Sequence, residues 1–397
     1  MTKKVMMRIC IILSLFITLL TFSGSNYCYG NQGGEKYIIK EVAFIPWGEE
    51  DSLLGFIPSA VDTNKMGETT WVEPGEAVRS WDIDLKGNIY VADGVKKRIS
   101  VYGPNGHYIR SIGTLDLSVN KITVKTTSGK EKTIYTYYPW RYDPLKNSNI
   151  PLPYKTYFDY YSDVAVDGNG NVYVITERGL VKFSPVGKLL EIVDQFGEYK
   201  REDIKGIGFD IRSNSIGHIF VGMITNSKQR IFAEFNNEGE FIATTENRIH
   251  PRDTQGNIYD MLPDGKSPLI SDKKVSFSIR YSQKIKSDSI TIYFGSPTAR
   301  GVIFRGVDGD GNIYLDVGWA LHKYDQKGNL LAIIQGKHDT KRTLTQPITG
   351  MGKISKLMAN GDIYVAYMCD QGFVVVKQEL QQETKGQILK PAVKPEK

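Results

Sequence analysis

The sequence predicts an all-β fold, a six-bladed β-propeller built from four-stranded antiparallel blades. Three observations predict it: a short phrase that recurs along the chain, strand-like apolar runs around each copy, and a composition rich in turn and strand formers. The 397 residues include 39 glycines and 23 tyrosines, which favours a turn-rich β protein. This length can bury one large repeat domain.

The first 30 residues differ from the rest. MTKKVMMR is basic, ICIILSLFITLLTF is an unbroken apolar run, and SGSNYCYG follows with small and polar residues. This order is typical of a secretory signal peptide, and the run is short for a membrane span. We therefore expect residues 1–30 to be removed and the protein to be exported, either secreted or associated with the cell envelope. An uncleaved N-terminal anchor is the alternative, and it is the only membrane attachment expected.

Charge and cysteines limit the partners and the means of stabilisation. The net charge of +6 includes Lys3, Lys4 and Arg8, so the chain after the signal carries about +3, too little to indicate nucleic-acid binding. Cys369 is the one cysteine beyond residue 30, so an exported form has no internal disulfide and depends on its core. We expect a monomer.

The recurring phrase is Gly-Asn-Ile-Tyr or a variant of it. It begins at Gly87, Gly170, Gly217, Gly256, Gly311 and Gly361. Most copies are roughly 40 to 55 residues apart, which is typical of propeller blades, and the first interval is about twice as long. An aspartate stands three residues before four of these glycines, at 84, 167, 253 and 308. Aspartate bonds to the backbone of its own turn, and glycine takes the left-handed position that closes it.

The two ends of the repeat region predict how the ring closes. The last unit has three strand-like runs, over 354–358, 362–368 and 373–379, and no fourth. Residues 37–46 form a strand-like run without a partner of its own, so we expect it to complete the last blade and remove an open edge. The propeller then covers residues 37–380.

Two segments fall outside the blade pattern. The long first interval contains an aromatic stretch that we interpret as an insertion at about 114–159, with a degenerate seventh blade as the alternative. Residues 381–397 are polar and basic, and we expect them to be disordered.

The units around Gly87, Gly170 and Gly311 resemble NHL repeats, in which a Val-Asp-x-x-Gly-Asn-Ile-Tyr-Val-Ala-Asp pattern starts each blade. The resemblance covers most of residues 75–380 and is weaker at the other three glycines. It implies a six-bladed propeller with its site in the central channel. Some six-bladed relatives are lyases with zinc-binding histidines or lactonases with a metal held by Glu, Asn and Asp.

The residues that differ between repeats are the first candidates for binding. The strand before each Asp-x-x-Gly turn lines the channel, and counting back six to eight residues from each glycine gives a mildly basic set that could hold an anionic group. The predicted channel-mouth residues are Arg79, Trp81, Asp163, Asp210, Arg248, His250, Arg305 and Lys353. Solvated or cross-blade paired side chains are the alternative.

The aromatic insertion supplies the second set of candidates. Rigid aromatic side chains lose little conformational entropy on binding, so they suit a platform or a lid for a sugar or a peptide. The predicted residues are Tyr137, Tyr138, Trp140, Tyr142 and Tyr157. The alternative is that they pack on the flank of the propeller.

We expect no metal and no other cofactor. Asp308-Gly-Asp310-Gly-Asn312 resembles the start of a calcium loop, but Ile313 replaces the required glycine and the turn already explains Asp308. The histidines have no metal-ligand spacing. The sequence thus predicts a non-catalytic binding propeller for a protein, peptide or glycan, and a metal-dependent channel enzyme, lyase or lactonase-like, is the alternative.

Overall fold

The computed structural model describes residues 37–55, 57–58, 62–63, 69–71, 74–76, 78–143, 148–158, 161–246, 252–263, 275–283, 286–294, 302–317, 320–335, 346–347, 355–369 and 371–380. The expected signal peptide and C-terminal tail lie outside them. Within these ranges the fold is all-β, with one short 3₁₀ turn, η1 (Arg201–Asp203). None of the described residues belongs to a helix long and apolar enough to cross a bilayer.

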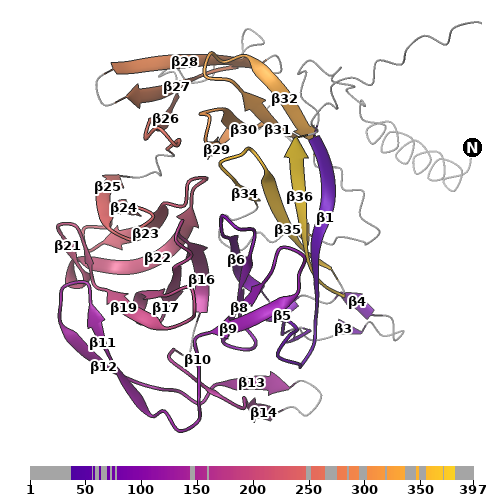
Figure 1. The fold of residues 1–397 in the computed structure, drawn as a ribbon, viewed down its shortest axis with the longest axis vertical. Coiled ribbons are helices and arrows are strands. Elements are labelled where there is room, and N and C mark those ends of the chain that lie inside the picture. Colours follow the sequence, from indigo (N-terminus) through magenta and orange to yellow (C-terminus); the bar gives the residue numbers. More distant parts are fainter. Residues whose placement is uncertain are drawn as a thin grey trace, which may run out of the picture.

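The strands form sheets arranged around a centre, in a propeller-like ring (Figure 1). Five sheets each contain four antiparallel strands that follow one another from the centre of the ring outward, and we call these sets of four strands blades A to E. Blade A contains β6 (Val78–Ile83), β7 (Ile89–Asp93), β8 (Arg98–Tyr102) and β9 (Tyr108–Ile112). Blade B contains β16 (Tyr161–Val166), β17 (Val172–Thr176), β18 (Gly179–Phe183) and β19 (Leu189–Val193). Blade C contains β22 (Ile204–Ser213), β23 (Ile219–Thr225), β24 (Arg230–Phe235) and β25 (Phe241–Glu246). Blade D contains β29 (Val302–Val307), β30 (Ile313–Val317), β31 (Ala320–Tyr324) and β32 (Leu330–Gln335).

Blade E joins the two ends of the repeat region. It contains β34 (Ser355–Leu357), β35 (Ile363–Cys369), β36 (Gly372–Leu380) and, outermost, β1 (Tyr37–Pro46); β33 (Gln346–Pro347) also pairs with β35. The register between β1 and β36 runs from Tyr37 opposite Leu380 to Pro46 opposite Gly372. The expectation that an N-terminal strand completes the last blade is confirmed.

The expected count of six four-stranded blades is wrong. Five sheets have this form in the described part of the chain, and the interval between blades C and D holds a sheet of three strands, β26 (Ile258–Pro263), β27 (Val275–Gln283) and β28 (Lys286–Phe294). Where an innermost strand would run, the described residues show a single bridge between Arg252 and Ile258. Residues 247–251, which precede this bridge, lie outside the described residues.

The aromatic insertion does not form a blade of its own. Its hairpin of β11 (Lys121–Thr126) and β12 (Glu131–Tyr135) joins the outer edge of blade B, where β11 runs parallel to β19 and makes the sheet six-stranded. A second hairpin pairs β13 (Trp140–Asp143) with β14 (Ser148–Pro151). The remaining pairs are short: β10 (Thr114–Leu115) with β15 (Lys155–Thr156), β2 (Ile57–Pro58) with β5 (Pro74–Glu76), β3 (Asp62–Thr63) with β4 (Thr69–Trp71), and β20 (Gln195–Phe196) with β21 (Tyr199–Lys200).

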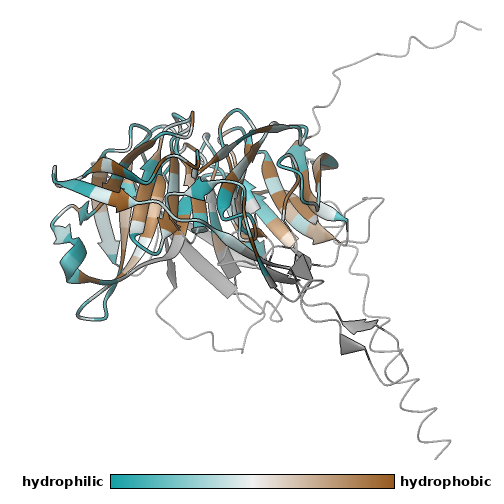
Figure 2. Cartoon of the chain, turned by 90° about the horizontal axis from the view of Figure 1, so that it is seen from below, coloured by the Kyte–Doolittle hydropathy of each residue, from teal (hydrophilic) through white to brown (hydrophobic). Residues whose placement is uncertain are grey.

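The core lies between neighbouring blades rather than at one central point. Separate clusters of buried apolar side chains join blade A to B, E to A, B to C, and D to E. Figure 2 shows the hydrophobic residues concentrated on the strands inside the ring and the hydrophilic ones on the loops at its rim. Burial at these junctions follows from the apolar strands after each turn, which are covered on both faces.

The recurring phrase builds a compact turn. In the turn at Asp308, one carboxylate oxygen accepts hydrogen bonds from the backbone N–H groups of Asp310 (3.1 Å) and Asn312 (2.9 Å). The other oxygen accepts from the Asn312 side chain (2.9 Å) and the Tyr314 hydroxyl (3.1 Å). Gly311 closes the turn at a φ of 78°, in the left-handed region that glycine enters without strain. The aspartate, glycine, asparagine and tyrosine of the phrase thus each have a structural role.

The same turn recurs at other blades, with one informative change. Asp84 and Asp253 make the same four bonds as Asp308. At Gly217 the turn begins with Asn214, whose side-chain oxygen accepts from Ile216 and His218. Asparagine has a single acceptor oxygen, and at this turn the chain has His218 and Phe220 in place of the asparagine and tyrosine that would donate to a second one.

These turns define two faces of the ring. Because strands in a blade alternate in direction, the Asp-x-x-Gly turns all lie on one face, the turn face. The links from the outermost strand of one blade to the innermost strand of the next lie on the opposite face, the connection face. Hydrogen bonds tie adjacent turns together, from Gly168 N–H to the Gly217 carbonyl (3.1 Å) and from Gly309 N–H to the Ala359 carbonyl (2.7 Å). The turn face is therefore braced from blade to blade.

Candidate functional site

The predicted channel-mouth residues fall into two groups. Arg248, His250 and Lys353 lie outside the described residues, as does the side chain of Asp210, although its strand β22 is described. Trp81 is 2% exposed and packs edge-on against Phe373 of blade E, so it belongs to the core between blades A and E. Arg79 is half-buried on β6.

The other two predicted channel residues have protein partners. Arg305 forms an ion pair with Asp316 on the neighbouring strand of blade D. Asp163 is 1% exposed and accepts hydrogen bonds from the N–H groups of Val164 (2.9 Å) and Ile211 (3.1 Å) and from the Ser80 hydroxyl. Asp163 thus links blades A, B and C.

A second buried cluster at the ring centre was missed by the sequence reasoning. The Lys356 ammonium of blade E lies 3.4 Å from Asp82 Oδ1 of blade A and also contacts the Ser213 hydroxyl of blade C. Asp82 Oδ2 accepts from that hydroxyl and from the Val166 N–H of blade B (2.9 Å). The cluster joins four blades, and its charges neutralise each other. Asp82 and Lys356 stand five residues before Gly87 and Gly361, so extending the count one position closer to the glycines would have found them.

A groove of about 410 Å³ opens on the connection face beside blade A. One wall is the link from blade E to blade A, with Trp47, Gly48, Glu49, Asp51 and Gly55. The other wall is the end of the aromatic insertion, with Ile150, Pro151, Leu152, Pro153 and Tyr154, and Val95 and Lys96 of the β7–β8 turn lie between the walls. Apolar and aromatic side chains thus dominate the insertion wall, and carboxylates stand on the other.

Two buried cations fix the first wall in place. Lys96 is 5% exposed, and its ammonium donates to the backbone carbonyls of Glu50 and Leu53 (2.7 Å to Leu53). Arg98 is 2% exposed, and its guanidinium donates to the Asp51 carboxylate (2.9 Å) and to the Asp51 carbonyl. Burial works against the charge of Arg98, but the Tyr154 and Asp93 oxygens outweigh it, so the pKa of Arg98 is raised. Both cations are held inside the protein.

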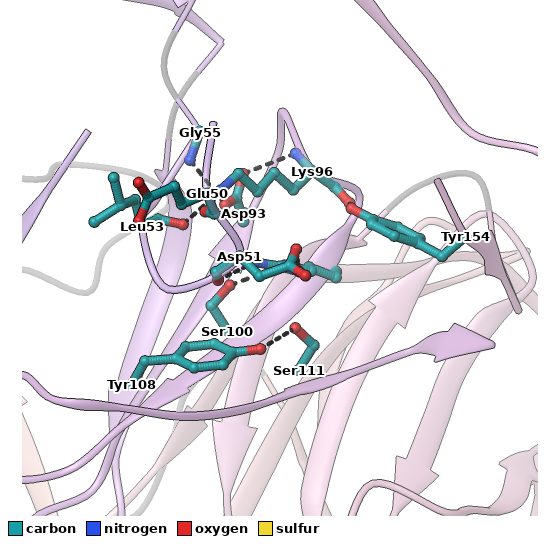
Figure 3. Close-up of polar contacts among 11 residues, drawn as sticks. Glu50, Asp51, Leu53, Gly55, Asp93, Lys96, Ser100, Tyr108, Ser111 and Tyr154 are labelled. Atoms are coloured by element: carbon teal, nitrogen blue, oxygen red, sulfur yellow. Dashed lines mark hydrogen bonds and ion pairs between the residues drawn. The ribbon is translucent and has the colours of Figure 1, made fainter. Parts of the chain in front are cut away.

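The second wall is tied to the first through the β7–β8 turn (Figure 3). The Tyr154 hydroxyl donates to the Lys96 carbonyl (2.6 Å), and burial raises the pKa of Tyr154. Asp93 accepts from the N–H groups of Gly55 (2.9 Å), Val95 (3.1 Å) and Lys96 (2.9 Å). Since Asp93 touches both the first wall and the turn, the groove is a pre-formed feature with hydrogen-bonded supports.

The five predicted aromatic residues of the insertion have different environments. Tyr138 and Trp140 are 55% and 53% exposed, beside the groove's insertion wall in sequence. Tyr137 is half-buried, and its hydroxyl accepts from Arg178 of the β17–β18 turn. Tyr157 is 9% exposed and packs against Phe158 and Phe183 in the core. The side chain of Tyr142 lies outside the described residues. The structure therefore offers Tyr138 and Trp140 to solvent and buries Tyr157.

The groove lies outside any metal-ligand cluster of the described residues. In the described part of the chain, no three His, Cys, Asp or Glu side chains are grouped so as to hold a metal ion. The groove brings together exposed carboxylates, a half-buried indole and phenol, and proline rings, a combination that contacts a ligand by apolar packing and hydrogen bonds.

Comparison with known proteins finds only distant similarity, to solved structures. No family model and no curated protein matches the chain, so membership of the NHL-repeat family is not confirmed. Among solved structures, a gluconolactonase from Xanthomonas campestris is 11% identical, covers 75% of this chain and 83% of its own, and has a TM-score of 0.35. Virginiamycin B lyase from Staphylococcus aureus is 10% identical, with 87% and 100% covered and a TM-score of 0.33. The β-propeller domain of the Trilobed protease from Pyrococcus furiosus is 14% identical, with 77% and 86% covered and a TM-score of 0.30. Similarity this distant carries no argument about this chain, and its all-β, propeller-like arrangement rests on its own sheets.

Proposed function

We propose that the protein is a binding propeller and that its ligand occupies the groove on the connection face. One observation carries the proposal: two segments outside the repeats meet there, and buried hydrogen bonds hold both of them in place. Loops fixed on a rigid scaffold are where binding sites concentrate. A wall that is already ordered loses little entropy when a ligand binds.

The groove is a better candidate than the ring centre. The described channel residues Asp82, Asp163, Arg305 and Lys356 all have protein partners, so a ligand there would have to displace existing bonds. The groove carries half-buried and exposed side chains. We also propose that the protein acts outside the cytoplasm, which rests on the signal-like pattern of residues 1–30.

The proposal is tested by locating the surface that captures ligands. The purified protein without residues 1–30 is screened against a glycan array and a phage-displayed peptide library, and each binder is measured again with Ile150→Arg. The arginine side chain projects from a half-buried position in the insertion wall and fills the groove. The control is Val186→Arg, which adds the same side chain to a turn of blade B where Val186 is 79% exposed.

We expect ligands captured by the wild-type protein to be lost with Ile150→Arg and kept with Val186→Arg. Far-ultraviolet circular dichroism and the unfolding midpoint establish that both variants are folded. Ligands that bind Ile150→Arg as tightly as the wild type would place the site elsewhere and refute the proposal.

A further inference from the structure

We propose that the groove is selective for an extended peptide that carries a basic side chain, so that a lysine or arginine of the ligand reaches the Asp51 carboxylate. This inference rests on the binding role proposed above and names its ligand class. Two features of the groove support it, the apolar insertion wall and the negative sign of the exposed charges.

The apolar wall fits a peptide in an extended conformation. Ile150 and Pro151 belong to β14, and Leu152, Pro153 and Tyr154 continue the chain along the same side of the groove. Side chains of an extended peptide alternate in direction, so every second one can rest on such a wall. Trp47 lines the other side of the groove.

The exposed charged side chains that line the groove are the carboxylates Glu49 and Asp51, although the whole chain has a net charge of +6. The two cations that hold the first wall are buried, Lys96 on backbone carbonyls and Arg98 on Asp51. The side chain of Asp51, by contrast, is 73% exposed. Its bond to Arg98 uses Oδ1, which leaves Oδ2 without a partner among the described residues.

Arg98 makes Asp51 a positioned carboxylate. Its guanidinium holds both the side chain and the backbone carbonyl of Asp51, so the second oxygen is oriented before any ligand arrives. A ligand ammonium or guanidinium can then form a charge-assisted hydrogen bond to Oδ2 while its aliphatic stem lies along the groove. A neutral sugar could use the aromatic rings but gains nothing from this charge.

The experiment selects peptides from a random heptapeptide phage library on the wild-type protein and measures the affinity of synthetic copies. We expect the selected sequences to be enriched in lysine and arginine. Their binding should weaken when sodium chloride rises from 50 to 500 mM, because salt screens an exposed charge pair. Replacing the basic residue of a selected peptide by glutamine should weaken binding about tenfold or more.

The matched variant is Asp51→Asn, which keeps an oxygen for Arg98 and removes the negative charge that faces the groove. We expect it to bind basic peptides about tenfold more weakly, whereas Glu131→Gln, which removes an exposed carboxylate of the β11–β12 hairpin, leaves affinity unchanged. Equal unfolding midpoints show that the loss is not one of folding, and Asp51→Glu serves as a charge-keeping variant if Asp51→Asn is destabilised.

The outcomes separate the two proposals. Peptides that depend on the groove but show no basic enrichment and no response to Asp51→Asn overturn this inference and leave the binding role intact. If the protein binds glycans and no peptides, and this binding is lost with Ile150→Arg, the inference is likewise overturned and the binding role stands. Binding that is unchanged by Ile150→Arg overturns both this inference and the proposed binding role of the groove.

Discussion

The burial of Asp308 predicts how much the recurring turn contributes to stability. The same turn occurs at Asp325, where the side chain accepts from the N–H groups of Lys327 and Asn329 and from the Asn329 side chain, all at 2.8 Å. Asp308 is 2% exposed, whereas Asp325 is half-buried and Leu331 stands where the tyrosine would follow it. Alanine at each position removes the same kind of turn bonds from two different environments.

The size of the stability loss depends on whether the donors that lose the aspartate can bond to water instead. Asp308→Ala removes the acceptor of the Tyr314 hydroxyl, which is fully buried; among the described residues it then has the Tyr37 hydroxyl alone, at 3.4 Å. A buried donor left unsatisfied costs about 1–3 kcal/mol, and each of the other lost bonds about 0.5–1.5 kcal/mol. Burial raises the pKa of Asp308, which means that its charge is itself costly and that part of the loss is recovered. We expect a net loss of about 3 kcal/mol for Asp308→Ala and about 1 kcal/mol for Asp325→Ala.

Urea unfolding followed by tryptophan fluorescence measures both values in the protein without residues 1–30. The comparison requires equal m-values, since a changed slope would report a changed unfolded state. Equal losses for the two alanine variants would refute the role assigned to burial. A loss below about 1 kcal/mol for Asp308→Ala would refute the role assigned to the turn itself.

Two further predictions concern buried charges. Glu234 is 2% exposed and bonds to His218 (2.9 Å) and Arg252 (2.7 and 3.0 Å); burial opposes its charge, but these bonds outweigh it and lower its pKa. Its ionised form therefore stabilises the fold above the unfolded-state pKa, and this contribution is lost as the pH falls through the lower folded-state pKa. In urea titrations, Glu234→Gln should lose less stability than the wild type between pH 6 and pH 3. An equal loss of stability in the two proteins would contradict this assignment. Lys356→Met leaves the Asp82 carboxylate, which is 3% exposed, without its cation, and it should lower the free energy of unfolding in urea by about 3–5 kcal/mol. Adding Asp82→Asn to this variant should recover part of the loss. A double variant less stable than the single one would contradict the pairing.

The repeated phrase carries enough information to predict the blades. Each Asp-x-x-Gly turn with its following Ile-Tyr or Val-Tyr marks the boundary between an innermost strand and a buried one, and the unpaired run at 37–46 predicts closure by β1. The count of four-stranded blades failed between blades C and D, where the turn at Asp253 is present and the described sheet has three strands. A turn depends on a few local residues, whereas a four-stranded blade also needs ladder partners from residues further along the chain, so the phrase alone does not fix the number of strands in a sheet.

The site was harder to predict because side chains at the ring centre pair with residues of other blades, and the sequence of one repeat does not show these partners. Arg305 and Asp163 were predicted to bind at the channel mouth, with solvated or cross-blade paired side chains as the alternative. Arg305 pairs with Asp316 on the next strand, and Asp163 accepts from Ser80 in another blade. The Asp82–Lys356 pair joins residues that are far apart along the chain. A sequence shows that a polar residue faces the ring centre, and only the assembled ring shows whether a partner neutralises it.

The groove follows from topology more directly than from its own residues. The link after β1 joins blade E to blade A, and the aromatic insertion joins blade A to blade B, so both must leave the ring on the connection face and flank the same blade. The β7–β8 turn of blade A emerges on that face as well, between the two links, and supplies Lys96 to one and its carbonyl to the other. Two long links on successive blades therefore meet over the blade they share. A blade count and the position of the long intervals are sufficient to predict where such a groove forms, even when the residues that line it have no recognisable pattern.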